Sequence, residues 1–143
     1  MSETFRPLPH YGCGAPRRLP DRSYLIEVLP AAAVAACPYC SSTELAGFGR
    51  RPRPVADLPL NGWPVRLLVQ VRRFRCTLCQ RTFYESLPEI DPQRFMTLRL
   101  KRWIAEEAGQ RTRVAVAAEA GLSEGTVRAV LRDLGTEAGV TVA

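Results

Sequence analysis

Two short stretches decide how the first half of this chain folds: CPYC at Cys37–Cys40 and FRCTLCQRTF at Phe74–Phe83. Each contains two cysteines separated by two residues, so each pair can hold one metal ion from a tight turn. Two such turns complete a tetrahedron of sulfur ligands. The spacing therefore predicts a closed zinc site whose four ligands are Cys37, Cys40, Cys76 and Cys79.

The residues beside the second cysteine pair are typical of a zinc ribbon. Phe74 and Phe83 flank this pair, where aromatic rings cover the apolar side of a metal, and the neighbouring residues favour strands. A closed site leaves no position for a catalytic water. The zinc is therefore expected to stabilise the fold of a small domain and to take no part in a reaction.

Two other interpretations of the cysteines remain open. Four thiolates also suit iron in a rubredoxin-like site, but such redox proteins are usually acidic and carry glycines where this chain has Ser41 and Gln80. The four cysteines would otherwise be unliganded core residues. The fifth cysteine, Cys13, has only His10 nearby in the sequence, and both are expected to be incidental.

The composition favours a polyanionic partner. The 143 residues carry a formal net charge of +6, which points to nucleic acid more than to an acidic small substrate. Nearly all of the cations are Arg in an Ala-rich chain, so a compositional bias of the genome is an alternative source of the charge. No apolar run is long enough to span a membrane.

The chain divides into three predicted regions. Residues 1–22 are rich in Pro and Gly and are expected to form a flexible arm. Residues 23–88 are predicted to be the zinc-ribbon domain, and residues 89–143 a helix-turn-helix domain. The fold class is therefore predicted as α+β: a small zinc-ribbon β domain followed by an all-α domain of three helices.

Several strands are expected in the zinc-ribbon domain. Residues 23–30 and 44–50 have strand composition, and a Pro-rich loop is expected from there through Pro54. Asn61-Gly62 is a hairpin signal. It precedes a long run in which Val65, Leu67, Val69 and Val71 alternate with more polar residues up to Cys76, and residues 81–85 offer a returning strand.

Beyond Pro88 the sequence becomes helical. Asp91-Pro92 opens a pattern that ends near Gly109, and two further helices are expected at residues 111–120 and 123–134.

The segment RVAVAAEAGLSEGTVRAVLR, residues 113–132, fits the helix-turn-helix pattern. It places Ala117 where two helices cross, Gly121 at a left-handed turn, and Val127 and Val130 on the buried face of the second helix. Ser123 is a natural N-cap for that helix. An ordinary helical hairpin is the alternative interpretation.

Two sets of polar residues are candidates for contact with DNA. On the second helix they are Ser123, Glu124, Thr126, Arg128 and Arg132. Arg128 is the best candidate for a base edge, whereas Glu124 more simply favours the helix N-terminus. The candidates for phosphate contact are Arg66, Arg72, Arg73, Arg75 and Arg81 in the ribbon, and Arg99, Lys101, Arg102, Arg111 and Arg113 in the helical half. A solvated face selected for solubility is the alternative for the ribbon set.

These motifs together resemble the N-terminal part of transposases of the insertion-sequence "L-three" family. The resemblance runs from about Tyr24 to Leu134 and is most specific in RRFRC and in the spacing of DLP to GWPV. It implies that the ribbon and the helix-turn-helix bind double-stranded DNA at the terminal inverted repeats of a mobile element. A later domain with three acidic residues performs catalysis in that family, and the sequence here stops where that domain is expected to begin.

The predicted function is sequence-specific DNA binding by a transposase-like region that is not itself an enzyme. Its expected cofactor is structural Zn²⁺, and its expected location is the bacterial cytoplasm in association with the nucleoid. A homodimer or a catalytic transposase subunit is a possible protein partner. The alternatives are a stand-alone transcriptional regulator or repressor and a zinc-ribbon module for protein–protein interaction.

Overall fold

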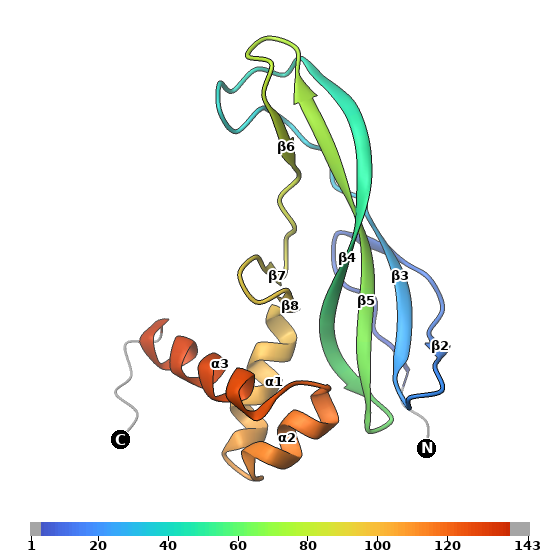
Figure 1. Ribbon diagram of the computed structural model, residues 1–143, viewed down its shortest axis with the longest axis vertical. Helices are drawn as coiled ribbons and strands as arrows, with labels where there is room; N and C mark the ends of the chain where they lie inside the picture. The colour runs from blue at the N-terminus through green and yellow to red at the C-terminus, as the bar shows by residue number, and fades with distance from the viewer. Residues whose placement is uncertain (1–3, 138–143) are drawn as a thin grey trace.

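A long two-stranded ribbon runs through the molecule in the computed structural model, which describes residues 4–137 (Figure 1). Its strands are β4 (Leu45–Leu60) and β5 (Trp63–Cys76), which pair in antiparallel fashion. Asn61 and Gly62 join them with φ values of 52° and 75°, as a two-residue turn with two left-handed positions requires. The predicted hairpin is therefore confirmed.

The other strands extend this ribbon into one mixed sheet. The sheet has the order β1-β3-β5-β4-β8-β7, while β2 pairs with β3 and β6 pairs with β5. Their bounds are β1 (Tyr11–Cys13), β2 (Arg17–Arg18), β3 (Tyr24–Pro30), β6 (Thr82–Tyr84), β7 (Ile90–Asp91) and β8 (Met96–Thr97). The strand β3 lies parallel to β5, and Tyr24 is opposite Val65.

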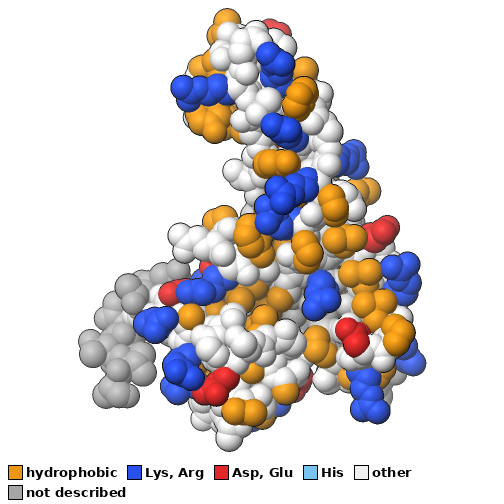
Figure 2. Space-filling model, viewed as in Figure 1, with side chains coloured by type: hydrophobic (Ala, Val, Ile, Leu, Met, Phe, Trp, Pro, Cys, Tyr) orange, Lys and Arg blue, Asp and Glu red, His pale blue; other side chains and the backbone are white. Residues whose placement is uncertain are grey.

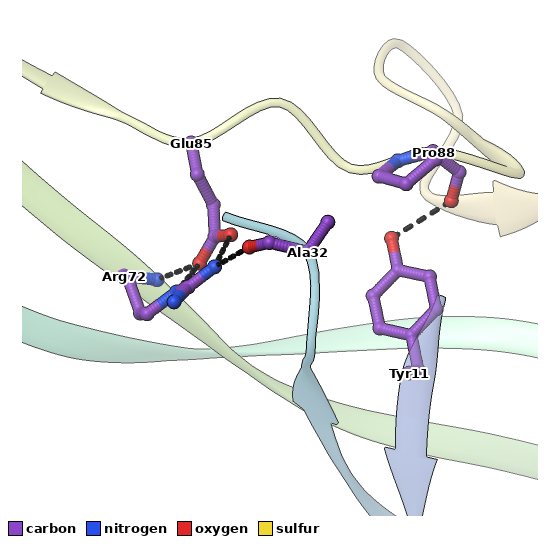
Figure 3. A network of polar contacts seen from close by, with 5 residues as sticks. All are labelled: Tyr11, Ala32, Arg72, Glu85 and Pro88. Carbon is purple, nitrogen blue, oxygen red and sulfur yellow. Dashed lines mark hydrogen bonds and ion pairs between the residues drawn. The ribbon is translucent and has the colours of Figure 1, made fainter. Parts of the chain in front are cut away.

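The segment predicted as a flexible arm differs from that expectation over the described residues. Residues 11–13 and 17–18 pair with β3. The Tyr11 hydroxyl also donates to the carbonyl of Pro88 at 2.7 Å (Figure 3), and burial is the main cause that raises the pKa of this phenol. These pairings join residues far apart in the sequence, so Pro and Gly content alone did not reveal them.

The predicted Pro-rich loop is instead part of β4. Pro52 and Pro54 lie opposite Gln70 and Leu68 of β5. Because the two prolines are two residues apart, their nitrogen atoms face the same edge of the strand. The other edge of β4 pairs with β8 only at Ala56. Ala56, two residues beyond Pro54, donates its N–H to the Phe95 carbonyl at 3.0 Å on that other edge. The proline nitrogens face the same edge, so the missing N–H groups remove no hydrogen bond to β5.

Apolar alternation along β5 builds the main core. Val65, Leu67, Val69 and Val71 are all buried, and they pack with β3 and with Val55 of β4. A second core lies among the helices, around Leu100, Val116 and Val127. A third and smaller one, at the far end of the ribbon, contains Cys37, Cys76 and Phe83.

Three helices follow the sheet: α1 (Leu98–Ala108), α2 (Arg113–Ala120) and α3 (Glu124–Glu137). Thr97 and Thr112 cap the first two through their side chains. The first helix starts later than Asp91-Pro92 indicated. Residues 90–91 pair with residues 96–97 as β7 and β8, and Met96 also lies opposite Ala56 of the ribbon.

Two contacts fix the helices against the sheet. The buried carboxylate of Asp57 on β4 accepts hydrogen bonds from Thr97 at 2.7 Å and from Arg99 at 2.6 and 2.9 Å. At the other contact, a Cβ atom added to Gly121 would lie 2.7 Å from Cβ of Pro64. The turn between α2 and α3 therefore packs directly on the hairpin end of the ribbon.

No helix among residues 4–137 is long and apolar enough to cross a membrane.

Candidate metal centre and nucleic-acid interface

The four predicted cysteines meet at the end of the ribbon that is opposite the hairpin turn. Their sulfur atoms all lie within 4.8 Å of one another. Sγ of Cys37 is 3.7 Å from Sγ of Cys79, and Sγ of Cys40 is 3.5 Å from Sγ of Cys76. A tetrahedron with zinc–sulfur bonds of about 2.3 Å has sulfur atoms about 3.8 Å apart. The donor set and its spacing therefore fit a tetrahedral zinc ion.

The two cysteine turns have the same backbone geometry. In the first, the N–H of Ser41 donates to the Cys37 carbonyl at 2.9 Å, and in the second the N–H of Gln80 donates to the Cys76 carbonyl at 2.9 Å. Ser41 and Gln80 both have left-handed φ values, 64° and 67°. At these two positions rubredoxin-like proteins carry glycine. The left-handed conformation explains that preference, because glycine adopts a positive φ without steric cost.

Backbone N–H groups donate to two of the four sulfur atoms. The N–H of Tyr39 donates to Sγ of Cys37 and that of Cys79 donates to Sγ of Cys76. The bond from Cys79 is the main cause that lowers the pKa of the Cys76 thiol, to about 6. A lower thiol pKa favours the thiolate, which is the form that binds zinc.

Aromatic rings cover one side of the cysteine cluster. Phe74 and Phe83 stack with their ring centroids 5.9 Å apart, and they pack on Cys37 and Cys76. With four protein ligands the site has no open coordination position, so a bound zinc ion would supply folding free energy here. Cys13 lies outside this cluster and packs against the main core.

The predicted basic residues do not form one surface. Arg72 binds Glu85 through two ion-pair contacts of 2.8 Å and also donates to the carbonyl of Ala32 (Figure 3). Glu85 is the largest cause that raises the pKa of this guanidinium. Arg72 therefore ties β5 to the segment after β6 and to the loop before the first cysteine pair.

Three further predicted cations are also engaged inside the molecule. Arg99 pairs with the fully buried Asp57, Lys101 is 5% exposed and contacts Asp91 at 2.7 Å, and Arg111 pairs with Glu107 and Glu119. These cations neutralise carboxylates of the same chain. They belong to the fold. The sequence had not revealed this because the partners Asp57, Asp91 and Glu119 lie on other strands and helices.

The remaining predicted cations face solvent to different degrees. Arg73 is half-buried, donates to Thr82 and lies between two aromatic rings. Arg81 lies 4.8 Å from the ring centroid of Tyr39. The exposed members are Arg66, Arg75, Arg81, Arg102, Arg113, Arg128 and Arg132.

The turn between α2 and α3 has the geometry that the sequence predicted. Gly121 is left-handed, with φ 70° and ψ 32°, and the N–H of Leu122 donates to the Ala117 carbonyl at 2.9 Å. Ser123 accepts from the N–H of Thr126 at 3.0 Å and so caps α3.

The start of α3 presents polar side chains to solvent while its other face is buried. Val127 and Val130 are fully buried, whereas Ser123, Glu124 and Arg128 are exposed and Thr126 is half-buried. Glu124 forms an ion pair with Arg128 at 3.1 Å, one helical turn away. Arg132 is exposed one further turn along the helix. Glu124, Arg128 and Arg132 are spaced by four residues and therefore share one exposed side of α3, with Ser123 at its start, whereas Thr126 lies nearer the buried face.

Comparison with known proteins adds two family matches. Residues 85–135 match the helix-turn-helix domain of transposase family ISL3, and residues 33–79 match the zinc-finger of transposase IS204/IS1001/IS1096/IS1165. Both matches are to domains of ISL3 transposases, one to the helix-turn-helix and one to the zinc ribbon, as the sequence motifs indicated. The zinc-ribbon match and the clustered cysteines together support structural zinc. No curated protein and no solved structure matches the chain.

Sequence reasoning missed part of the ribbon surface. Phe48, Arg51, Arg53 and Tyr84 were not among the candidate contacts, yet the structure places them with Arg73 on one face. The interpretation of residues 51–54 as a loop hid this, because a loop gives no rule for which side chains share a face. Strand alternation through the two prolines was the signal that could have found it.

Proposed function

We propose that this chain binds double-stranded DNA in a sequence-specific manner, at sites such as the terminal inverted repeats of a mobile element. The observation that carries the proposal is the α2–α3 arrangement, in which a left-handed Gly121 positions a capped and exposed helix start. In helix-turn-helix proteins the N-terminal residues of the second helix contact base edges in the major groove. Here α3 would occupy that position.

The base-reading residues in this proposal lie on α3. Arg128 has the guanidinium that suits a guanine edge, and its ion pair with Glu124 is exposed and therefore exchangeable for a DNA contact. Ser123 and Thr126 offer hydroxyl groups near the helix start, where the helix dipole also favours a phosphate. Arg132 lies beyond them, in reach of the flanking backbone.

Phosphate contacts would come from the exposed arginines outside α3. These are Arg66, Arg75, Arg81, Arg102 and Arg113. Arg72, Arg99, Lys101 and Arg111 are left out of the proposed interface, because each would first have to give up an internal carboxylate partner. For Arg99, whose partner Asp57 is fully buried, breaking the ion pair costs about 3–5 kcal/mol, more than a phosphate contact at the surface returns.

Zinc would support this function through rigidity. Cys37, Cys40, Cys76 and Cys79 are the proposed ligands, and together they close the end of the ribbon. Thiolates would take all four coordination positions of the zinc ion, which leaves none for a catalytic water. We therefore propose that the zinc site supports DNA binding and does not catalyse cleavage or joining of DNA strands. We keep the three-part division at residues 1–22, 23–88 and 89–143 as a proposal for how the chain is organised.

A repressor or regulator that occupies the same element ends would use the same contacts. A regulator of this kind would bind paired half-sites as a dimer, whereas a monomeric transposase fragment would bind a single site. Molecular mass measured in solution with and without DNA separates these two uses.

The test is duplex binding with a salt series. A preferred duplex is first selected from a randomised pool with the whole chain. We expect affinity for it to fall steeply as salt rises, because phosphate contacts release counterions. The variant Arg128→Ala should lose about 5- to 150-fold on the preferred duplex and discriminate less between sequences.

Arg113→Ala is the matched control for that test. It should weaken binding to all duplexes to a similar extent and reduce the salt slope by about one. If the intact, zinc-loaded chain binds no duplex in a salt-dependent manner, the proposal is wrong and a protein-interaction module becomes the better interpretation.

A further inference from the structure

The face of the ribbon that lines the main core continues beyond the end of that core. Val69 and Val71 of β5 are buried on this face, and their β4 partners are Arg53 and Arg51. Two and four residues further along β5, Arg73 and Arg75 lie on the same side, because side chains alternate along a strand. Apolar core residues are thus followed by guanidinium groups.

Aromatic rings lie between these guanidinium groups. The Arg73 guanidinium is 5.0 Å from the ring centroid of Phe48 and 5.7 Å from that of Tyr84. Phe48 is 46% exposed and Tyr84 is 43% exposed. Each ring is therefore held by a cation while a large part of it stays open to solvent. We call Phe48, Arg51, Arg53, Arg73, Arg75 and Tyr84 the ribbon strip.

A cavity of about 390 Å³ adjoins the lower part of the strip. Its lining includes Arg51, Arg53 and Tyr84 from the strip and Leu87 and Pro92 from the segment that leads to the helices. Cavities that hold small organic ligands start near this size, at about 300 Å³. The Arg53 guanidinium lies 4.1 Å from the ring centroid of Phe95, so the cavity also has a stacked cation and ring in its wall.

The strip carries positive charge without a competing free acid. Glu85 lines the cavity, but its carboxylate is bound by the Arg72 side chain at 2.8 Å and by the Arg72 backbone N–H at 2.7 Å. Among residues 4–137, none of the four arginines of the strip forms an ion pair with a carboxylate. In Figure 2, cationic and apolar side chains alternate along the upper ribbon on the face in view.

We propose that the ribbon strip binds the unpaired nucleotides of a single DNA strand. Phe48 and Tyr84 would stack on bases, the arginines would contact phosphates, and the cavity would receive one base. A base has an open face only when it has left the duplex, so exposed rings among guanidiniums match a single strand better than a double helix. This inference deepens the proposed function, since it rests on DNA being the partner, and adds unpaired DNA as a second substrate form.

The test compares two single strands of equal length, oligo-dT and a fully abasic strand, with the intact zinc-loaded chain. Both strands carry the same phosphates, and only oligo-dT carries bases. We expect oligo-dT to bind at least about tenfold more tightly, since each stacked base contributes a factor of about 5 to 150. Equal affinity for the two strands overturns the proposal.

Substitutions then locate the effect. Tyr84→Ser and Phe48→Ser should each reduce oligo-dT affinity by about tenfold and leave binding of the abasic strand unchanged. The matched control is Leu29→Ser on β3, whose side chain is 48% exposed away from the strip; it should bind oligo-dT as the natural chain does. If both strip variants retain zinc and full oligo-dT affinity, the strip is not the binding surface.

The outcome for duplex DNA separates this inference from the proposed function. Arg128→Ala should weaken binding of the preferred duplex and leave the oligo-dT preference over the abasic strand intact. If the natural chain binds no duplex and still prefers oligo-dT to the abasic strand, the proposed function of α3 is wrong and the strip proposal stands. If the natural chain binds the duplex without any preference for oligo-dT, the strip proposal alone is wrong.

Discussion

The two ends of the ribbon are held together by different physical forces. At the cysteine end, which we call the tip (residues 34–47 and 74–83), the buried apolar cluster consists of Cys37, Cys76 and Phe83. At the hairpin end, β3, β4, β5 and the helices contribute to two larger clusters of buried, mostly aliphatic side chains. A cluster as small as that of the tip cannot offset the entropy of ordering its own loops. The comparison indicates that metal ligation stabilises one end and apolar burial the other.

The largest expected effect comes from removing the metal. Chelation, or Cys76→Ser, should unfold the tip with a loss on the order of 10 kcal/mol of metal-dependent folding free energy. The hairpin end should keep its structure, because its cores contain no zinc ligand. The sequence predicted zinc as the stabiliser of the whole ribbon domain, residues 23–88. The cores at the hairpin end limit the expected unfolding to the tip.

Amide hydrogen exchange with and without chelator measures this difference residue by residue. Cys13→Ser is the control, since Cys13 lies outside the cluster of sulfur atoms, and it should bind one zinc as before. Loss of protection in β3 together with the tip would show that the two ends are not independent.

The second largest effect should come from Asp57→Asn at the hairpin end. Asp57 is fully buried and accepts from both Thr97 and Arg99, so the substitution leaves a guanidinium that is only 15% exposed without its counter-charge. We expect a loss of about 3–5 kcal/mol in the free energy of unfolding, measured by urea denaturation of the zinc-loaded protein.

Glu27→Gln serves as the control for that measurement. Glu27 is an exposed acid on β3, and its change should stay within about 0.5 kcal/mol. If Asp57→Asn is equally mild, the helices are not fixed to the sheet by this ion pair.

Gly121→Ala should give the next effect. The left-handed φ of 70° costs a residue with a Cβ about 1–2 kcal/mol, and the added atom would lie 2.7 Å from Cβ of Pro64, so the hairpin end must also shift. Thermal unfolding measures the loss. Gly125→Ala is the matched control, because its added Cβ meets only the Ser123 hydroxyl at 3.9 Å, and alanine favours helix. Equal behaviour of the two variants would contradict the close contact of the helix turn with the ribbon.

The smallest expected effect concerns pH. The hydrogen bond from Arg94 lowers the pKa of Asp133 below its usual value, and this pair joins the segment before α1 to α3. A depressed carboxyl pKa contributes stability that is present above about pH 4, the unfolded value, and is lost as pH falls through the folded pKa.

Asp133→Asn should therefore be slightly less stable than the natural chain at pH 6 and equally stable near pH 3. Chemical denaturation of both proteins at each pH gives the comparison, and acid effects on the zinc site cancel in the difference. A constant difference at all pH values would mean that the ion pair is not its origin.

The features that the sequence predicted well are local ones. Asn61-Gly62 specifies its turn through the φ values that these residues tolerate, and Gly121 and Ser123 specify a helix boundary in the same way. The spacing of each cysteine pair specifies a tight turn within a few residues, and the two turns have the same backbone hydrogen bond. The valine alternation in β5 needed no knowledge of the partner strand, because burial of one face is enough to produce it.

The features that the sequence did not predict depend on distant partners. The prolines of β4 predicted a loop, because their pairing with β5 is not visible in the local sequence. Residues 90–97 predicted the start of a helix, because the pairing of Met96 with Ala56 joins residues 40 positions apart. Arg99 was counted as a DNA contact because its partner, Asp57, lies 42 residues away in the sequence. Charge alone does not show which arginines are already neutralised.

The length of β5 has a consequence for the size of a DNA site. Its 14 residues, at about 3.3 Å per residue, separate the tip from the turn between α2 and α3 by roughly 45 Å. One turn of B-form DNA measures about 34–36 Å. A duplex bound along both ends of this molecule is therefore protected over more than ten base pairs, so that a nuclease footprint would extend past the bases that α3 alone can reach.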